Sequence, residues 1–440
     1  MQNIISKLNA PTKEERLSNA IEVRALIDNG SIKLPALTDE VNNHVHTIYS
    51  FSPYSPTAAA WGAMQAGLQA VGIMDHDSVS GIDEMLQAGA ILGIATTAGC
   101  EIRVSMRGTM METKSTNYPG VTGFSYIALH GIPANAINAC KEFLLPMQNA
   151  RNERNKKMVD KLNSLIIPFG LTAIDFNEDV YNQSMACEHG SITERHILAA
   201  LSRKMINHFG KGADLISFVV NELKQKISPK IESQLLDADN PHYLYDLLGI
   251  LKAEFAESFF ITPNEDECIP VKKAIAFADS IGAISAYAYL GDVTESPTGD
   301  KKAEKFEDEY LDDLIITLKE LGFRAVTYMP PRNTISQLHR IRNLCEKYDL
   351  MQISGVDINS SRQTFNCKEI LDPQFNNLIV ATWALIGHEK FSTINPGNGL
   401  FSENAIAKFP LLKDRLSAYC EIGSSLDSSA PYKMPDNLPL

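Results

Sequence analysis

The chain has 440 residues, a length that predicts about two or three globular units, and its 44% hydrophobic and 21% charged residues are ordinary values for a soluble protein. Its net charge of -13 disfavours broad binding to nucleic acid, and no apolar run of about 18 residues predicts a membrane span. The seven cysteines form no CxxC pair, which argues against a disulfide framework or a thiolate zinc site. With a start that lacks the pattern of a signal peptide, these features predict a cytoplasmic protein.

Residues 1–38 are predicted to form an N-terminal helical extension, in which KEERLSNAIEVRALIDNG is a helix that ends at Gly30. Short apolar runs follow, and they are VNNHVHT, QAVGIMDH, GIATTAGCEIRV, FSYIALHG, GAISAYAYL, FRAVTYMP and LMQISGVD. Rich in valine, isoleucine and aromatic residues without strict alternation, they predict strands that are buried on both faces. Amphipathic segments of helical length separate most of them, so we expect an α/β fold of βα units.

The predicted barrel is discontinuous. It is expected over residues 39–140 and 271–425, while residues 141–270 show helical periodicity without a convincing strand and predict a helical insertion. The polar, proline-containing residues 426–440 predict an extended tail.

Residues that can bind a metal ion stand at the ends of five predicted strands. They are His44 and His46, Asp75 and His76, Glu101, His130 and Asp357. In a βα barrel the carboxyl ends of the strands gather on one face, where active sites lie. Imidazole and carboxylate ligands without thiolates suit Zn, Mn or Fe, and a carboxylate such as Glu101 can bridge two ions.

Each of these residues also has an ordinary structural explanation. A histidine at a strand end is more often a hydrogen-bonded structural residue, and Asp357 could cap a helix. Asp75 could orient an imidazole ring, and Asp77 could cap the helix that follows. The joint placement at consecutive strand ends is what favours a metal site.

The segments HVHT, GIMDHDSVSG, GCEIRV, FSYIALHG, TERHILAAL and ISGVDIN follow one another in the order of known motifs. They resemble the PHP (polymerase and histidinol phosphatase) family, nearest its nucleoside phosphatase branch with a helical insertion. The resemblance covers roughly residues 40–370. It implies a distorted, TIM-like barrel of seven βα units and a metal-dependent phosphoesterase.

The resemblance also implies roles for individual residues. A first ion would be held by His44, His46, Glu101 and Asp357, and a second by Glu101 with His130. His76, which matches a ligand of a third ion, is taken with Asp75 as catalytic. Three further ligand positions of the family hold Phe51, Tyr287 and Asn359 in this chain, so we expect one or two divalent ions (Zn, Mn or Fe) rather than three.

Two arginines are placed to bind phosphate, because a guanidinium group meets two phosphate oxygens at once. Arg103 lies two residues beyond Glu101 and on a strand would share its face. Arg195 and His196 resemble the Gly-Arg-Pro-His segment of the nucleoside phosphatases, which makes them predicted substrate ligands. Arg195 could instead be a solvated helix charge, and His196 could pack beneath it.

The predicted function is hydrolysis of a small phosphomonoester, of nucleotide or sugar phosphate type, by metal-activated water. The alternative is a degenerate domain that binds a metal or a phosphorylated ligand without turnover. A proofreading module of a polymerase ranks last, because the chain is acidic and has no polymerase-length extension.

Overall fold

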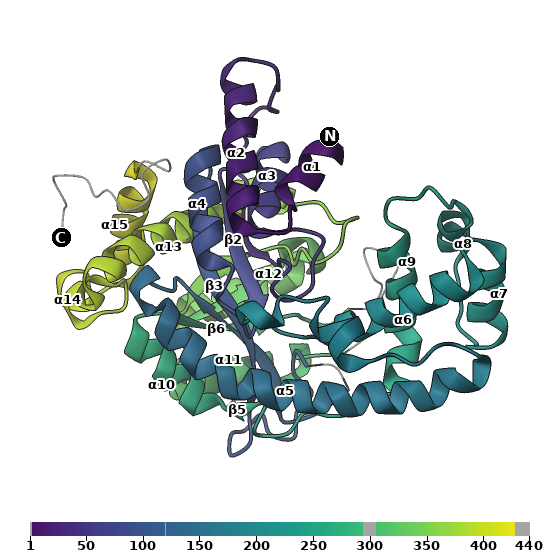
Figure 1. Cartoon of the computed structure of the whole chain (residues 1–440). Helices are drawn as coiled ribbons and strands as arrows, with labels where there is room; N and C mark the ends of the chain where they lie inside the picture. The colour runs from purple at the N-terminus through teal and green to yellow at the C-terminus, as the bar shows by residue number, and fades with distance from the viewer. Residues whose placement is uncertain (1, 119, 294–304, 427–440) are drawn as a thin grey trace.

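A sheet curled into a nearly closed barrel forms the centre of the computed structural model (Figure 1). The structure describes residues 2–118, 120–293 and 305–426. Seven strands follow one another around the barrel, and they are β1 (Val41–Val45), β2 (Ala70–His76), β3 (Ala95–Ser105), β4 (Phe124–His130), β6 (Ile284–Tyr289), β7 (Ala325–Tyr328) and β8 (Met351–Ser354). The two-residue strand β5 (Ile269–Pro270) lies off this path and pairs only with β3. The predicted distorted seven-stranded α/β barrel is confirmed.

The barrel closes between β1 and the segment that follows β8. Val45 forms a bridge with Ile358, in which His46 N donates to Ile358 O at 2.9 Å and Ile358 N donates to His44 O at 3.1 Å. The two histidines of the HVHT segment are therefore fixed by backbone hydrogen bonds beside Asp357.

One strand runs against the prediction of parallel βα units. β4 is antiparallel to both β3 and β6, with Glu101 opposite Ala128 and Gly99 opposite His130. The carboxyl end of β4 thus lies at the opposite end of the barrel from the carboxyl ends of its neighbours. The prediction that His130 joins the other strand-end residues on one face is wrong for this reason.

Helices pack on the outer surface of the sheet and end where the next strand begins. They are α3 (Pro56–Gln65), α4 (Ile82–Leu92), α10 (Val271–Ile281), α11 (Leu311–Leu321) and α12 (Ile335–Lys347). Gly93, Gly282 and Gly322 end α4, α10 and α11 in the left-handed conformation, which glycine adopts without a steric penalty. Each of these helices thus turns directly into a strand of the barrel.

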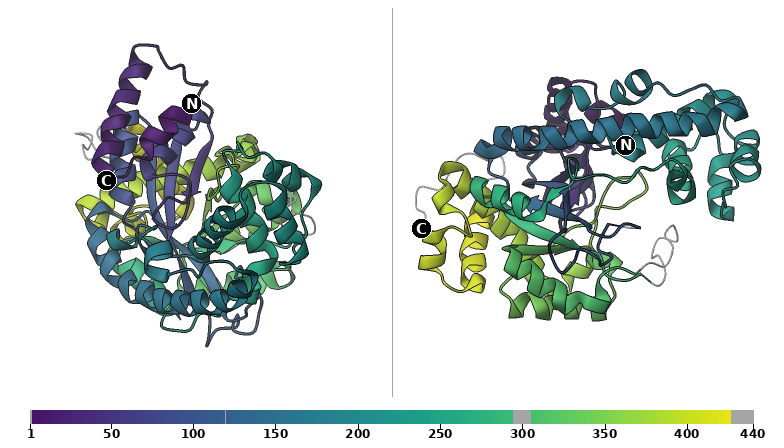
Figure 2. Two further views of the ribbon diagram at one scale, coloured as in Figure 1. Left: turned by 45° about the vertical axis from the view of Figure 1, so that its right-hand side comes forward. Right: turned by 90° about the horizontal axis from the view of Figure 1, so that it is seen from below.

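The first and last helices that the structure describes pack on the helices around the barrel (Figures 1 and 2). The predicted single N-terminal helix is two helices, α1 (Gln2–Leu8) and α2 (Lys13–Asp28), because Thr12 and Glu15 form a capping box that starts α2. The C-terminal helices are α13 (Asn376–Ile394), α14 (Glu403–Lys408) and α15 (Leu412–Ser425). Buried residues of α13 share a core with the inward side chains of β6 and β8, so α13 covers one end of the barrel.

A helical lobe with its own hydrophobic core lies beside the barrel, and we define it as residues 158–259. Its helices are the second half of α5 (Ile137–Ile166), α6 (Glu194–Phe209), α7 (Ala213–Asn221), α8 (Pro229–Leu236) and α9 (Tyr243–Ile250). The long α5 connects the two parts (Figure 2): its first half packs into the barrel core and its second half into the core of the lobe. The predicted insertion, residues 141–270, includes this lobe, and its bounds remain a proposal.

Two predictions about the chain as a whole concern its tail and its relation to membranes. The predicted tail, 426–440, lies outside the described residues except for Leu426. Within the described ranges, no helix has both the length and the apolar character that crossing a bilayer requires.

Candidate metal centre

Five side chains from four separate segments converge at one end of the barrel. They are His44 and His46 at the end of β1, His76 at the end of β2, Glu101 on β3, and Asp357 after β8. Potential ligand atoms of His44, His46 and Asp357 lie within 4.8 Å of one another, as do those of His46, His76 and Glu101. His46 belongs to both groups, so the five residues form one cluster.

The ring nitrogens face the carboxylates across this cluster. His46 Nε2 lies 3.3 Å from Asp357 Oδ1, and His44 Nε2 lies 3.9 Å from Glu101 Oε2. His76 Nδ1 lies 3.0 Å from Glu101 Oε2, yet this buried nitrogen has no hydrogen-bond partner. A ring nitrogen and a carboxylate oxygen that lie this close without a hydrogen bond have the arrangement of two ligand atoms of one metal ion. Nitrogen and oxygen ligands suit Zn, Mn or Fe.

Burial and neighbouring charges set the protonation of the cluster. Burial lowers the pKa of His44, and burial together with His46 holds the pKa of His76 well below its usual value. Burial raises the pKa of Glu101. Burial also opposes the charged forms of His46 and Asp357, but the hydrogen bond between these two side chains outweighs it. The pKa of His46 is therefore raised, and the pKa of Asp357 is held well below its usual range. Neutral imidazoles at His44 and His76 are the form that binds a metal ion.

Asp75, predicted to be catalytic, lies outside the cavity in a network of hydrogen bonds. Its carboxylate is fully buried and accepts hydrogen bonds from Thr47 N, Thr47 Oγ1 and Ser50 Oγ, each at 2.6 Å. The Ser50 hydroxyl in turn lies 3.2 Å from His46 Nδ1. This placement argues against the predicted catalytic role of Asp75.

His130 is absent from both ligand groups. Its side chain is 1% exposed, its Nε2 has no hydrogen-bond partner, and burial together with His44 lowers its pKa to about 3. Because β4 is antiparallel, His130 lies opposite Gly99, two residues deeper in the barrel than Glu101. The structure therefore gives no support to His130 as a metal ligand.

A cavity of about 330 Å³ opens beside the cluster, between the barrel and the helical lobe. His44, His76, Glu101 and Asp357 line one end of it. Basic and acidic side chains line the rest, and they are Arg103, Glu194, Arg195, Lys252 and Arg332. Aromatic residues complete the lining, and they are Tyr118, Tyr126, Phe260, Tyr289 and Tyr328.

Arg195 reaches the cavity from the start of α6. Its Nη1 donates to Asn359 Oδ1 at 2.7 Å and to Asn359 O at 3.2 Å, and Asn359 Nδ2 donates to Asp357 Oδ1 at 2.6 Å. Asn359, a predicted vacant ligand position, thus lies beside the cluster and links Asp357 to Arg195.

Arg103 also lines the cavity, but its charge is already paired. It is 4% exposed and forms an ion pair with Glu267, which also binds Arg151 and Arg154 of α5. Arg151 contacts Asp77 as well, at 2.5 Å. Arg103 is therefore part of a buried ion-pair cluster, which argues against its predicted role as a phosphate ligand.

Three further predicted positions point away from the cluster. Tyr287 is opposite Ile127, on the outer face of the sheet, and its hydroxyl donates to Glu307 at 3.0 Å, so Ala286 and Ala288 take the inner face instead. Phe51 packs its ring on His196. His196 is buried, accepts a hydrogen bond from Thr193 N as the cap of α6, and has a pKa lowered by burial to about 3. Of the two alternatives for His196, packing is the one that fits.

Several residues of the site were not predicted from the sequence. Glu194 stands directly before Arg195, and although burial opposes it, Lys252 and Arg195 lower its pKa. Tyr126 lies four residues before His130 and so shares its strand face, which alternation along β4 could have indicated. Nothing in the sequence marks Ser50 as part of the site except its position in the loop after HVHT.

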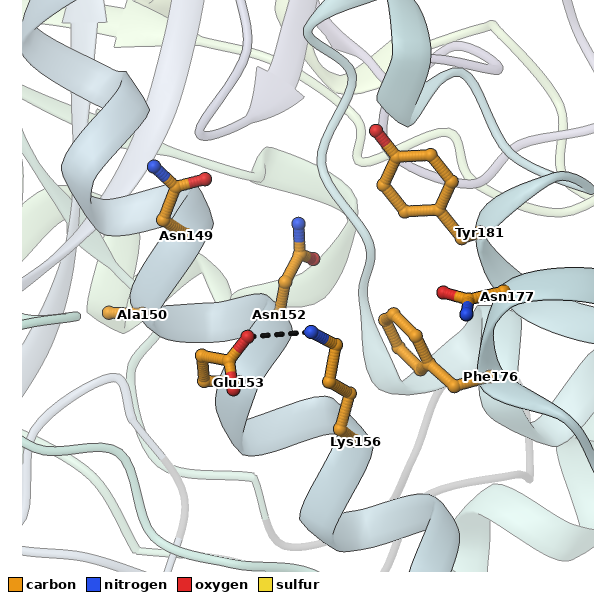
Figure 3. Close-up of a pocket in the computed structure, with 8 residues that line it drawn as sticks. All are labelled: Asn149, Ala150, Asn152, Glu153, Lys156, Phe176, Asn177 and Tyr181. Atoms are coloured by element: carbon orange, nitrogen blue, oxygen red, sulfur yellow. Dashed lines mark hydrogen bonds and ion pairs between the residues drawn. The ribbon is translucent and has the colours of Figure 1, made fainter.

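A second and larger cavity, about 440 Å³, lies between α5 and η3 (Phe176–Tyr181), a short π-helix (Figure 3). Its lining residues are Asn149, Ala150, Asn152, Glu153, Lys156, Phe176, Asn177 and Tyr181. The one carboxylate among them, Glu153, is paired with Lys156 at 2.7 Å, and no histidine is present. This cavity lacks the ligands of a metal site, so the functional site is placed at the smaller one.

The barrel and its cluster of imidazole and carboxylate side chains define the class of protein, a barrel protein with a candidate site for divalent metal ions. The PHP domain model matches residues 42–392, and the chain belongs to the PHP domain family.

Individual relatives are distant. A 5'-3' exoribonuclease of Haemophilus influenzae is 27% identical over 161 residues, which are 36% of this chain and 49% of that protein, so the chain spans about half the length of this relative. A crystal structure from Bifidobacterium adolescentis, assigned to the metal-dependent phosphoesterases, is 18% identical with a TM-score of 0.47 and covers 77% of this chain and 96% of that one. An amidohydrolase from Chromobacterium violaceum with bound sulfate is 16% identical with a TM-score of 0.46, covering 73% and 88%.

Proposed function

We propose that the protein hydrolyses a small phosphomonoester at a centre of one or two divalent ions held by His44, His46, His76, Glu101 and Asp357. The observation that carries the proposal is the approach of His76 Nδ1 to Glu101 Oε2 at 3.0 Å without a hydrogen bond, inside a cavity lined by basic residues. When bound, such ions supply an activated water and neutralise the phosphoryl oxygens. We further propose that it acts in the reducing cytoplasm, in line with its free cysteines.

The walls of the cavity indicate the kind of phosphomonoester. Arg195, which donates to Asn359 beside the cluster, offers its guanidinium group to a phosphate bound in the cavity. The rings of Tyr118, Tyr126 and Phe260 offer flat faces on which a planar group can stack. Together they favour a nucleotide over a sugar phosphate.

The direct test combines metal analysis with a substrate panel. Protein purified without chelator is expected to carry one or two ions per chain and to release phosphate from nucleotides, sugar phosphates or p-nitrophenyl phosphate. A short 5'-phosphorylated RNA belongs in the panel, because the Haemophilus relative is an exoribonuclease. Chelation should stop the release and added Mn²⁺ or Zn²⁺ should restore it. Bound metal without release from any panel member would instead establish the degenerate, non-hydrolytic alternative.

Arg195→Ala is expected to lower turnover of the best substrate by about ten- to a thousandfold, or about 1.4 kcal/mol per tenfold. Metal content should stay unchanged, because Arg195 contacts Asn359 and not the ligand atoms. Arg195→Lys should recover part of the loss, since it restores the charge without the fork. The matched control is Arg203→Ala, an exposed arginine of the same helix. Equal turnover of Arg195→Ala and wild type would contradict the assignment of the lobe to the active site.

A further inference from the structure

The loop after β1 carries a chain of hydrogen bonds that ends on a proposed metal ligand. Asp75 Oδ1 accepts from Thr47 N and from Ser50 Oγ, both at 2.6 Å, and Asp75 Oδ2 accepts from Thr47 Oγ1. The Ser50 oxygen also lies 3.2 Å from His46 Nδ1. All four side chains are at most 2% exposed, so water does not compete for these contacts.

The positions of the protons follow from counting donors. A serine hydroxyl has one hydrogen, and here it points to Asp75 Oδ1, an oxygen that already accepts a backbone N–H. The Ser50 oxygen is left as an acceptor for its other neighbour, His46 Nδ1. That nitrogen must then carry a hydrogen, and the second nitrogen, Nε2, is the one that faces Asp357.

We propose that Ser50, held by Asp75, fixes the proton of His46 on Nδ1 and so keeps Nε2 free to bind the metal ion. The inference rests on the metal centre of the proposed function but on no particular substrate. His46 is the residue shared by the two ligand groups, so its orientation affects both. Hydrogen-bond partners of this kind fix the tautomer and the ring plane of a ligating histidine.

The test uses zinc-loaded, ¹⁵N-histidine-labelled wild-type protein and three variants. In the wild type, NMR is expected to show His46 bound through Nε2 with a hydrogen-bonded proton on Nδ1. Ser50→Ala should lose this proton signal and raise the zinc dissociation constant by about 10- to 100-fold. Ser50→Thr retains a hydroxyl and should restore both the signal and most of the affinity.

Ser52→Ala is the matched control, because Ser52 is a buried serine of the same loop whose hydroxyl accepts from Tyr54 N and not from the network. It should leave the signal and the zinc affinity unchanged. Coordination of zinc through Nδ1 in the wild type would overturn the proposal. This measurement needs no variant, so it tests the proposal even if Ser50→Ala does not fold. Wild-type zinc affinity in folded Ser50→Ala would overturn it too. An intact Nδ1 proton in a protein without phosphatase activity would contradict the proposed hydrolysis and leave the inference about Ser50 standing.

Discussion

Glu101→Gln is expected to strip the protein of bound metal and to lower phosphoester hydrolysis by about a thousandfold or more, roughly 4 kcal/mol of transition-state stabilisation. Glu101 contacts His44 on one side and His76 on the other, so its loss affects both ligand groups. Glutamine keeps the shape of the side chain and removes the negative charge, which separates the loss of a ligand from a packing defect. Elemental analysis and phosphate release on the same sample give the two readings.

The control for this substitution is Glu265→Gln, which changes an exposed carboxylate that is paired with Arg107 outside the cluster. It should retain wild-type metal content and turnover. Full metal content in Glu101→Gln would refute the assignment of Glu101 as a ligand, whatever the activity.

Glu267→Ala is expected to destabilise the folded protein by about 3–5 kcal/mol, because it leaves buried guanidinium groups without their shared carboxylate. Arg103, Arg151 and Arg154 all bind this one carboxylate, and Glu267 is 3% exposed. Arg103 lies on β3 and the other two arginines on α5, so the cluster joins the barrel to the helix that leads into the lobe. Urea denaturation at pH 7 measures the change in the free energy of unfolding.

The contribution of Glu267 should also depend on pH. Although burial raises the pKa of Glu267, the three arginines lower it to about 2 in the folded protein, against an ordinary value of 4.5. The stabilisation is therefore fully present above pH 4.5 and is lost as the pH falls toward 2. The stability difference between wild type and Glu267→Ala should shrink over this range, and Glu257→Ala, which removes an exposed carboxylate, is the matched control. A difference of less than 1 kcal/mol at pH 7 would contradict the structural importance of the cluster.

The strands and the barrel could be predicted from the sequence because apolar runs and helical segments leave a local periodic signal. The direction of a strand leaves no such signal, so the antiparallel β4 and the resulting depth of His130 were missed. The register of a strand leaves no local signal in the sequence either. A shift of one residue along β6 moves Tyr287 to the outer face of the sheet.

Within the site, the prediction brought together the residues that stand next to strand ends, such as His46 and Asp357. It failed for contacts with residues that stand at no predicted strand end. Arg103 is predicted to bind phosphate from its position near Glu101. Its partner Glu267 stands 164 residues later, and nothing near Arg103 in the sequence indicates that the two charges pair. The spacing of Arg103 from Glu101 indicated the correct face of β3, but a shared face does not determine the partner.

The two sides of the active-site cavity are built on separate hydrophobic cores, the ligand cluster on the barrel and Arg195 on the helical lobe. This separation bears on how the protein can diversify under the proposed function. Substitutions that repack the lobe move Arg195, Glu194 and Lys252 relative to the cluster and leave the backbone bridge between Val45 and Ile358 untouched. Selection for a new substrate can therefore act on the lobe while the chemistry of the barrel is inherited unchanged.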